Sequence, residues 1–307
     1  MRTAAMASLE VELAGTKLRN PIMLASGFLD ETGGSMLRVY RAGAGAVVTK
    51  SIGPEPRLGY PNPTVVPLDV GLLNAVGLPN PGIEEYRAEV EVALRGGAVV
   101  IGSVYGKDAD EYAAVAKRMA GYGVAAIELN LSCPHAKGLG TEIAQHEEAV
   151  REFSAVVKAK VSVPVFAKLS PNVANIGHFA QAAEDGGADG VTAINTVRAM
   201  AIAPELGIPA LAYGFGGLSG PPIRPIGVRC VYEIYDSVDI PVVGVGGIGT
   251  GRDALEYIMA GATAVQIGTA VLDRGLDVFG LVAKELSSLL EELGYASVHD
   301  AVGVAHD

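Results

Sequence analysis

The stretch Ala126-Ile-Glu-Leu-Asn-Leu-Ser-Cys-Pro-His135 is the clearest copy of the pattern that decides the fold. Apolar and polar residues alternate up to Leu131, and Pro134 then ends the pattern because proline cannot continue a strand ladder. We predict a buried strand followed by a loop, with the Cys133 thiol where the strand becomes the loop. Gly138-Leu-Gly140 would give that loop the backbone freedom of a lid.

Similar apolar runs, each closed by polar or small residues, recur along the chain. We count eight: Pro21–Ser26, Ala46–Lys50, Ala98–Val104, Ala126–Ser132, Pro164–Ser170, Gly190–Asn195, Pro241–Gly246 and Ala264–Thr269. Helical periodicity fills most of the gaps, as in Asp110–Gly121, His146–Val161, Ile176–Gly186 and Gly251–Gly261. Strands that alternate with helices pair in parallel through right-handed crossovers. Eight such units predict a (β/α)8 TIM barrel, an α/β fold of about 250 residues.

The remaining length of the 307-residue chain predicts additions to this barrel. Alternation on both sides of Ala14-Gly15 predicts a small N-terminal β-hairpin over Val11–Leu18, which would plug one end of the barrel. The excess falls mainly in Ser51–Gly97 and Thr196–Asp239, and we expect insertions after strands 2, 4 and 6. No linker or change in composition divides the chain, so we predict one domain over residues 1–307.

The run Gly244-Val-Gly-Gly-Ile-Gly249 also fits the dinucleotide-binding pattern G-x-G-x-x-G. That motif needs an acidic residue about 20 positions later, where this chain has Thr263-Ala264. In a barrel, glycines after strands seven and eight, here with Gly268-Thr269, instead form a phosphate cradle of backbone N–H groups. We therefore favour the barrel over a Rossmann fold.

Composition restricts the partners of the protein. Half of the residues are hydrophobic, which predicts a sizeable core, and the net charge of −11 argues against a nucleic-acid partner. Two cysteines, Cys133 and Cys230, form no disulfide framework and cannot hold an iron–sulfur cluster within this chain. Met1–Lys17 does not resemble a signal peptide, and no apolar run approaches about 18 residues. We expect a soluble, cytoplasmic protein with no metal site and no membrane contact.

Polar side chains stand at or just past the C-terminal ends of several predicted strands. They are Ser26, Lys50, Asn130, Cys133, Lys168, Asn195 and Thr196. In a barrel these ends converge on one mouth, where active sites lie. Each residue alone has a structural explanation, such as a solvated strand end or a turn former. Their shared register is hard to obtain by chance, and it indicates a site.

The residue types suggest the chemistry of that site. Two lysines can stabilise an anion, and several asparagines offer paired donors and acceptors to a planar amide or imide ring. Cys133 has no evident His–Asp relay, so we interpret it as a general base or acid rather than a nucleophile. The alternative for Cys133 is an inert buried thiol, which is our interpretation of Cys230.

Nine short motifs cover nearly the whole chain: Asn20-Pro-Ile-Met-Leu-Ala-Ser-Gly27, Thr49-Lys-Ser51, Leu73-Asn-Ala-Val-Gly-Leu-Pro-Asn-Pro-Gly82, Glu128-Leu-Asn-Leu-Ser-Cys-Pro134, Ala167-Lys-Leu-Ser-Pro171, Ile194-Asn-Thr196, Gly216-Gly-Leu-Ser-Gly220, Gly244-Val-Gly-Gly-Ile248 and Gln266-Ile-Gly-Thr269. In type and order they resemble the dihydroorotate dehydrogenase family. The resemblance implies an FMN-containing barrel that oxidises (S)-dihydroorotate to orotate in de novo pyrimidine biosynthesis.

Carried over position by position, the resemblance implies a role for each matching residue. Cys133 would be the base that removes the C5 proton while hydride leaves C6 for the flavin. The substrate carboxylate and ring would be held by Lys50, Asn74, Ala75, Val76, Gly77, Leu78, Asn130, Asn195 and Thr196. FMN would be held by Ser26, Lys50, Ser51, Asn130, Lys168, Ile194, Gly220, Gly246, Gly247, Gly268 and Thr269. Among these, Lys168 would stabilise the negative charge of the reduced flavin.

The cysteine base resembles class 1 of the family. Asn74-Ala-Val-Gly-Leu78 and Gly217-Leu-Ser-Gly-Pro-Pro-Ile-Arg-Pro225 are more similar to class 1B, the NAD-linked type. That class implies a homodimer joined to a separate subunit, in which an iron–sulfur cluster of the [2Fe-2S] type and FAD pass electrons to NAD+. This chain would then be the catalytic half. The fumarate-linked class 1A is the alternative.

Two positions depart from the family's pattern. His135 replaces the Asn that often follows Cys-Pro, a variant that also resembles the uracil/dihydrouracil domain of dihydropyrimidine dehydrogenases. Ser103 stands where class 1B commonly has an Asn, so we expect at most a shorter hydrogen bond to the flavin. Two other kinds of protein stay open: a flavin-free barrel enzyme for a phosphorylated sugar or amino-acid precursor, and a non-catalytic scaffold.

Overall fold

A closed barrel of eight parallel strands forms the centre of the protein in a computed structural model that describes residues 7–131 and 146–306. In chain order the strands are β3 (Ile22–Leu24), β4 (Ala46–Val48), β7 (Val100–Val104), β8 (Ala126–Asn130), β9 (Val165–Leu169), β10 (Gly190–Ala193), β15 (Val242–Val245) and β16 (Ala262–Ile267). Each pairs with the next, and β16 pairs with β3 to close the barrel. The predicted TIM barrel is confirmed, with each strand inside one of the eight expected runs or overlapping it.

Helices connect the strands and cover the outside of the barrel. They are α1 (Gly33–Arg41), α2 (Ile83–Arg95), α3 (Ala109–Gly121), α4 (Glu147–Lys158), α5 (Ile176–Asp185), α6 (Arg224–Tyr235), α7 (Gly251–Met259), the short α8 (Val271–Arg274) and α9 (Val278–Leu293). Side-chain caps fix several of their starts: Thr32, Asp108, Asn175 and Thr250 each accept a hydrogen bond from a backbone N–H of the first turn. The four helices predicted from periodicity are all present.

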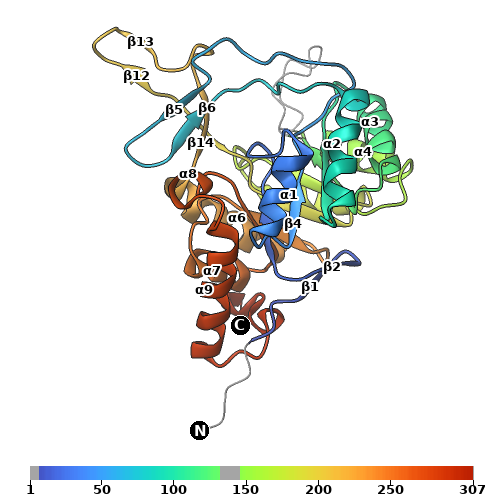
Figure 1. The fold of residues 1–307 in the computed structure, drawn as a ribbon, viewed down its shortest axis with the longest axis vertical. Helices are drawn as coiled ribbons and strands as arrows, with labels where there is room; N and C mark the ends of the chain where they lie inside the picture. The colour runs from blue at the N-terminus through green and yellow to red at the C-terminus, as the bar shows by residue number, and fades with distance from the viewer. Residues whose placement is uncertain (1–6, 132–145, 307) are drawn as a thin grey trace.

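The predicted N-terminal hairpin is present as β1 (Val11–Leu13) and β2 (Thr16–Leu18). Its Leu13 and Leu18 are buried and pack against barrel residues that include Met23 and Phe166. In Figure 1 the hairpin and the C-terminus lie away from the end where β5, β6, β12 and β13 project. The hairpin thus closes one end of the barrel with apolar side chains, and the other end stays available for polar groups.

The insertions after the second and sixth barrel strands join into one small antiparallel sheet. Its order is β11 (Val197–Ala199), β14 (Gly216–Ser219), β6 (Leu72–Asn74) and β5 (Val65–Pro67), and we call it the mouth sheet. A separate hairpin, β12 (Ile202–Ala203) with β13 (Ile208–Pro209), extends beyond it (Figure 1). These two insertions were predicted. The insertion predicted after the fourth strand falls on residues 132–145, outside the described part of the chain.

No helix within residues 7–131 and 146–306 combines the length and the apolar character that crossing a bilayer requires. Cys230 lies in α6 with no exposed surface, and burial raises its pKa to about 11. Such a thiol carries little thiolate at neutral pH, which agrees with the interpretation of Cys230 as a buried, unreactive residue.

Candidate active site at the barrel mouth

Two adjoining cavities open at the C-terminal ends of the barrel strands. The larger, of about 430 Å³, lies between the barrel and the mouth sheet, and we call it the amide pocket. The smaller, of about 280 Å³, is bounded by the glycines after β15 and β16, and we call it the glycine pocket. Both are lined by Ser26, Lys168, Asn195, Thr196 and Ser219. One ligand of the size of a nucleotide cofactor can therefore extend from one cavity into the other.

Asparagines at the ends of β8 and β10, the two strands on either side of β9, form the polar wall of the amide pocket. The Asn195 side-chain amide donates to Oδ1 of Asn130 at 3.3 Å, and that of Asn130 donates to the Ser51 hydroxyl at 3.0 Å. Ser51 lies 3.3 Å from the hydroxyl of Ser26 and 2.9 Å from that of Ser103. These bonds fix which edge of each amide donates and which accepts, and so prepare the wall to recognise a planar ring.

The segment Asn74–Leu78 lies along the same pocket where the mouth sheet meets the barrel. The Asn74 side-chain amide donates to the carbonyl of Gly217 at 3.2 Å, which joins the two insertions beside the site. Gly77 and Leu78 both have positive φ, at 79° and 56°. A left-handed conformation is unusual for leucine and is often associated with ligand sites.

The glycine pocket is shaped by close backbone contacts. Gly247 has φ of +69°, and a Cβ there would come within 2.7 Å of the carbonyl oxygen of Gly220; a Cβ on Gly268 would meet the Phe28 ring at 3.2 Å. Within the described residues, the amides of Gly247, Gly268 and Thr269 donate no hydrogen bond. Backbone N–H groups of this kind are the usual ligands of a phosphate.

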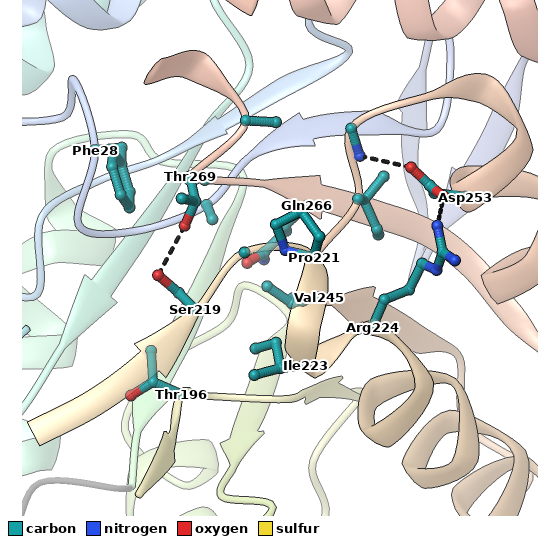
Figure 2. Close-up of a pocket in the computed structure, with 18 of the residues that line it drawn as sticks. Phe28, Thr196, Ser219, Pro221, Ile223, Arg224, Val245, Asp253, Gln266 and Thr269 are labelled. Atoms are coloured by element: carbon teal, nitrogen blue, oxygen red, sulfur yellow. Dashed lines mark hydrogen bonds and ion pairs between the residues drawn. The ribbon is translucent and has the colours of Figure 1, made fainter. Parts of the chain in front are cut away.

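Side chains hold the glycine pocket from both sides, as Figure 2 shows. The Thr269 hydroxyl donates to that of Ser219 at 2.8 Å, which ties the end of β16 to the mouth sheet. On the other side Arg224 pairs with Asp253, whose second oxygen accepts the amide of Gly249 at 3.0 Å. Both carboxylate oxygens of Asp253 are thus engaged by groups of the protein itself.

Lys50 and Lys168 lie at the amide pocket in different surroundings. Lys50 is 3.8 Å from the exposed Glu31 carboxylate and close to the fully buried Asp30. Burial raises the pKa of Asp30 to about 6, against the opposing effect of Lys50. Lys168 is buried and lies 3.2 Å from Glu128, a carboxylate inside the barrel. Both ammonium groups therefore supply positive charge in a partly desolvated site, where it acts more strongly than in water.

The structure brings all the predicted substrate and cofactor residues that it describes to this one mouth. The amide pocket is lined by Lys50, Asn74, Ala75, Val76, Gly77, Leu78, Asn130, Asn195 and Thr196. The cofactor set lines the two cavities, from Ser26 and Ser51 to Gly220, Gly246, Gly247, Gly268 and Thr269, with Lys168 and Ile194 between them. Their individual roles stay predictions. Cys133 and His135 lie outside the described residues.

Ser103 does not line either cavity. It is fully buried, and its hydroxyl bonds Ser51 while its amide donates to the Thr49 hydroxyl at 2.9 Å. Ser103 therefore supports Ser51 from behind the wall.

Several residues at the site were not singled out in the sequence. Glu128 and Gln266 occur within the quoted motifs but were given no role, and none was given to Asp30, Ser219 or Arg224. A signal existed for Glu128, because a charged residue inside an otherwise apolar barrel strand needs a buried partner. Nothing local marked Gln266 or Ser219, since their partners come from segments far away along the chain.

Comparison with known proteins agrees with this geometry. Residues 8–290 match the family model described as dihydroorotate dehydrogenase. The chain belongs to the dihydroorotate dehydrogenase family. A relative from Methanocaldococcus jannaschii is 50% identical over 97% of this chain and 98% of its own length, and one from Pyrococcus abyssi is 51% identical over 97% and 99%. A third, from Thermoplasma acidophilum, is 50% identical over 98% and 99%. All three are named dihydroorotate dehydrogenase B (NAD(+)), catalytic subunit.

Proposed function

We propose that this protein is the catalytic subunit of an NAD-linked dihydroorotate dehydrogenase and oxidises (S)-dihydroorotate to orotate in pyrimidine biosynthesis. The observation that carries the proposal is the pair of adjoining cavities, one walled by oriented amides and one by glycine backbone. This pair occurs in a chain about 50% identical, over nearly its whole length, to relatives with that name. The amide pocket suits a small planar ring, and the glycine pocket suits a phosphate.

The residues fit FMN as the cofactor. A Cβ on Gly247 would clash with the Gly220 carbonyl oxygen, so the close backbone packing of the glycine pocket requires glycine there. Within the described part of the chain, the amides of Gly247, Gly268 and Thr269 are free to bind a phosphate. Ser26, Lys50, Ser51, Asn130, Lys168 and Ile194 would contact the flavin ring, and Gly220, Gly246, Gly247, Gly268 and Thr269 its phosphate side. When bound, the flavin supplies the acceptor for the hydride that leaves C6 of the substrate.

The residues of the chain bind, orient and deprotonate the substrate in this proposal. Lys50 attracts the substrate carboxylate, and Asn74, Asn130 and Asn195 hold the ring through its amide and imide groups. Cys133 Sγ removes the proton from C5, for which a thiolate near lysines is suited. The backbone of residues 75–78 and the Thr196 hydroxyl complete the enclosure and exclude water.

Electrons then leave through a partner. The relatives' names contain "catalytic subunit" and "NAD(+)", which supports a second subunit here. From the resemblance to class 1B we infer that it carries FAD and a [2Fe-2S] cluster, a cluster that the two cysteines of this chain could not ligate by themselves. A homodimer of this chain, a single FMN-binding domain over residues 1–307 and a cytoplasmic location belong to the same proposal.

An anaerobic half-reaction tests the proposal. The purified chain, reconstituted with FMN if needed, is expected to be yellow and to bleach on addition of dihydroorotate but not of dihydrouracil. Bleaching with dihydrouracil alone would assign a dihydropyrimidine dehydrogenase-like activity, whose enzymes the His135 variant also resembles. A protein that binds no FMN would overturn the flavoenzyme assignment and leave a flavin-free barrel.

A further inference from the structure

Four polar side chains form a closed hydrogen-bonded cluster inside the barrel. They are Glu128 of β8, Lys168 of β9, Thr192 of β10 and Gln266 of β16, and we call them the buried polar cluster. None is more than 5% exposed. Lys168 and Gln266 line the cavities, whereas Glu128 and Thr192 line neither. Glu128 is thus a buried carboxylate one layer behind the surface that a ligand would touch.

Glu128 is the centre of the cluster. Its Oε1 accepts from the Lys168 ammonium at 3.2 Å, and its Oε2 accepts from the Gln266 amide at 2.8 Å and from the Thr192 hydroxyl at 3.1 Å. A buried charge needs such partners, because burial removes its hydration. The three bonds fix the carboxylate, and the Gln266 bond also fixes the orientation of that amide.

Two members of the cluster accept hydrogen bonds from the Lys168 ammonium. It donates to Glu128 Oε1 and to Gln266 Oε1, both at 3.2 Å. An ammonium has three N–H donors, and these two acceptors take two of them. Lys168 borders both cavities, so the third donor is the one available to a ligand there.

We propose that Glu128 is a positioning residue that directs the remaining N–H of Lys168 into the cavity and offsets part of its positive charge, and thereby lowers the reduction potential of the bound flavin. The inference rests on the proposed function, since it concerns FMN. Reduction adds negative charge to the flavin, and a nearby positive charge stabilises the reduced form. The Glu128 carboxylate weakens that field, so it holds the flavin at a lower potential than Lys168 alone would.

The test is the FMN reduction potential of Glu128→Gln, measured by anaerobic dye equilibration. Glutamine keeps the size of the side chain and removes its charge. The ratio of reduced to oxidised flavin at fixed ambient potential is expected to rise about tenfold, which is about 30 mV for a two-electron couple. Thr192→Val, which removes one hydrogen bond but no charge, should change the ratio less than about threefold by the same relation.

Asp189→Asn is the matched control for net charge. Asp189 pairs with Lys158 at 2.5 Å and accepts the amide of Val165, the first residue of β9, at the opposite end from Lys168. The substitution removes one negative charge from a carboxylate–lysine pair at the start of β9, away from the mouth. The FMN reduction potential should therefore stay at the wild-type value. An equal rise in Asp189→Asn and Glu128→Gln would overturn the inference, as would an unchanged or lowered potential in Glu128→Gln.

A second variant tests the inference if Glu128→Gln fails to fold. If Glu128→Gln does not fold, Glu128→Asp is measured instead, because it keeps the charge but withdraws it from Lys168. A smaller rise in the same direction is expected, and an unchanged potential counts against the inference. If the wild-type protein binds no FMN, the proposed function fails and this inference fails with it. If FMN binds and its reduction potential is the same in wild type and in the Glu128 variants, only the inference fails.

Discussion

The two ends of the barrel interior are built from the same strands but have opposite chemistry. At the hairpin end, Ala126, Phe166 and Ala264 belong to an apolar cluster with Leu13 and Leu18. Two positions later on the same strands stand Glu128, Lys168 and Gln266, three of the four members of the buried polar cluster. Since alternate residues of a strand share a face, both sets point into the barrel.

This difference teaches that the interior face of five of the eight barrel strands, β4, β7, β8, β9 and β16, is divided along its length. The first inward residue supplies packing, and the next supplies charge or hydrogen bonds for the site. In the same way, the apolar Ile101 is followed two positions later by Ser103, and Val48 by Lys50. Changes at the hairpin end should therefore alter stability, whereas changes at the mouth should alter binding and chemistry. The predictions below test that division.

Cys133→Ser at the mouth has the largest expected effect. Removal of a general base typically costs 10²- to 10⁴-fold in rate, so flavin bleaching by dihydroorotate at neutral pH should slow by at least about 100-fold. Stopped-flow absorbance measures it. Cys230→Ser is the control, because Cys230 is buried in α6 away from the cavities, and its bleaching rate should match wild type. Unchanged bleaching in Cys133→Ser would favour a non-catalytic scaffold.

Phe166→Ala at the hairpin end should mainly reduce stability. The ring is buried against the hairpin, and loss of such a side chain typically costs about 3–5 kcal/mol in the free energy of unfolding. Urea denaturation measures the loss, and the bleaching rate per folded molecule should stay within about twofold of wild type, since such chemistry depends on mouth residues. Leu58→Ala, at a fully exposed leucine, should change stability by less than about 0.5 kcal/mol. A large loss of rate in folded Phe166→Ala would contradict the division.

Asp30 is buried and lines neither cavity, and its carboxyl should make the free energy of unfolding depend on pH. Its pKa is raised from 3.8 to about 6, chiefly by burial. The folded protein then binds this proton more tightly than the unfolded chain, so the contribution of Asp30 to stability falls as pH rises from about 4 to about 6. At about 1.4 kcal/mol per pKa unit, the loss reaches up to about 3 kcal/mol.

Asp30→Asn should remove that loss. The free energy of unfolding of Asp30→Asn, measured in urea, should increase relative to that of wild type as pH rises from about 4 to about 7. The increase should reach up to about 3 kcal/mol. Glu31→Gln is the control, because Glu31 is mostly exposed. Its curve should run nearly parallel to that of wild type. A parallel curve for Asp30→Asn would show that Asp30 does not titrate in this range.

Gly247→Ala in the glycine pocket should weaken FMN binding about tenfold, equivalent to about 1.4 kcal/mol. The added Cβ would meet the Gly220 carbonyl oxygen at 2.7 Å and displace the cradle. Gly207→Ala is the matched control, with a similar φ of +65° and no atom within 4 Å of its Cβ. Both variants bear the same backbone strain, so titration with FMN isolates the cradle. Equal affinities would remove Gly247 from the phosphate site.

Much of the barrel and of its mouth could be predicted because the signals are local. Apolar runs mark each strand, and polar residues such as Lys50, Asn130 and Lys168 follow at a fixed register, so chain order alone sends them to one end. The cross-barrel bond from Gln266 to Glu128 gave no such signal, because it joins residues 138 positions apart. The same is true of Asp30, whose burial depends on Tyr86 and the helices around it.

The sequence by itself determined the barrel, the plugging hairpin and those mouth residues that follow the strand ends directly, because periodicity and turn residues act over a few positions. Only the tertiary structure decided that the two insertions pair into the mouth sheet, where Asn74 meets Gly217 across 143 positions. It also decided that the Glu128 carboxylate pairs with Lys168 inside the barrel and does not face a ligand. Both depend on which distant segments come within hydrogen-bonding distance, and that is settled only when the barrel closes.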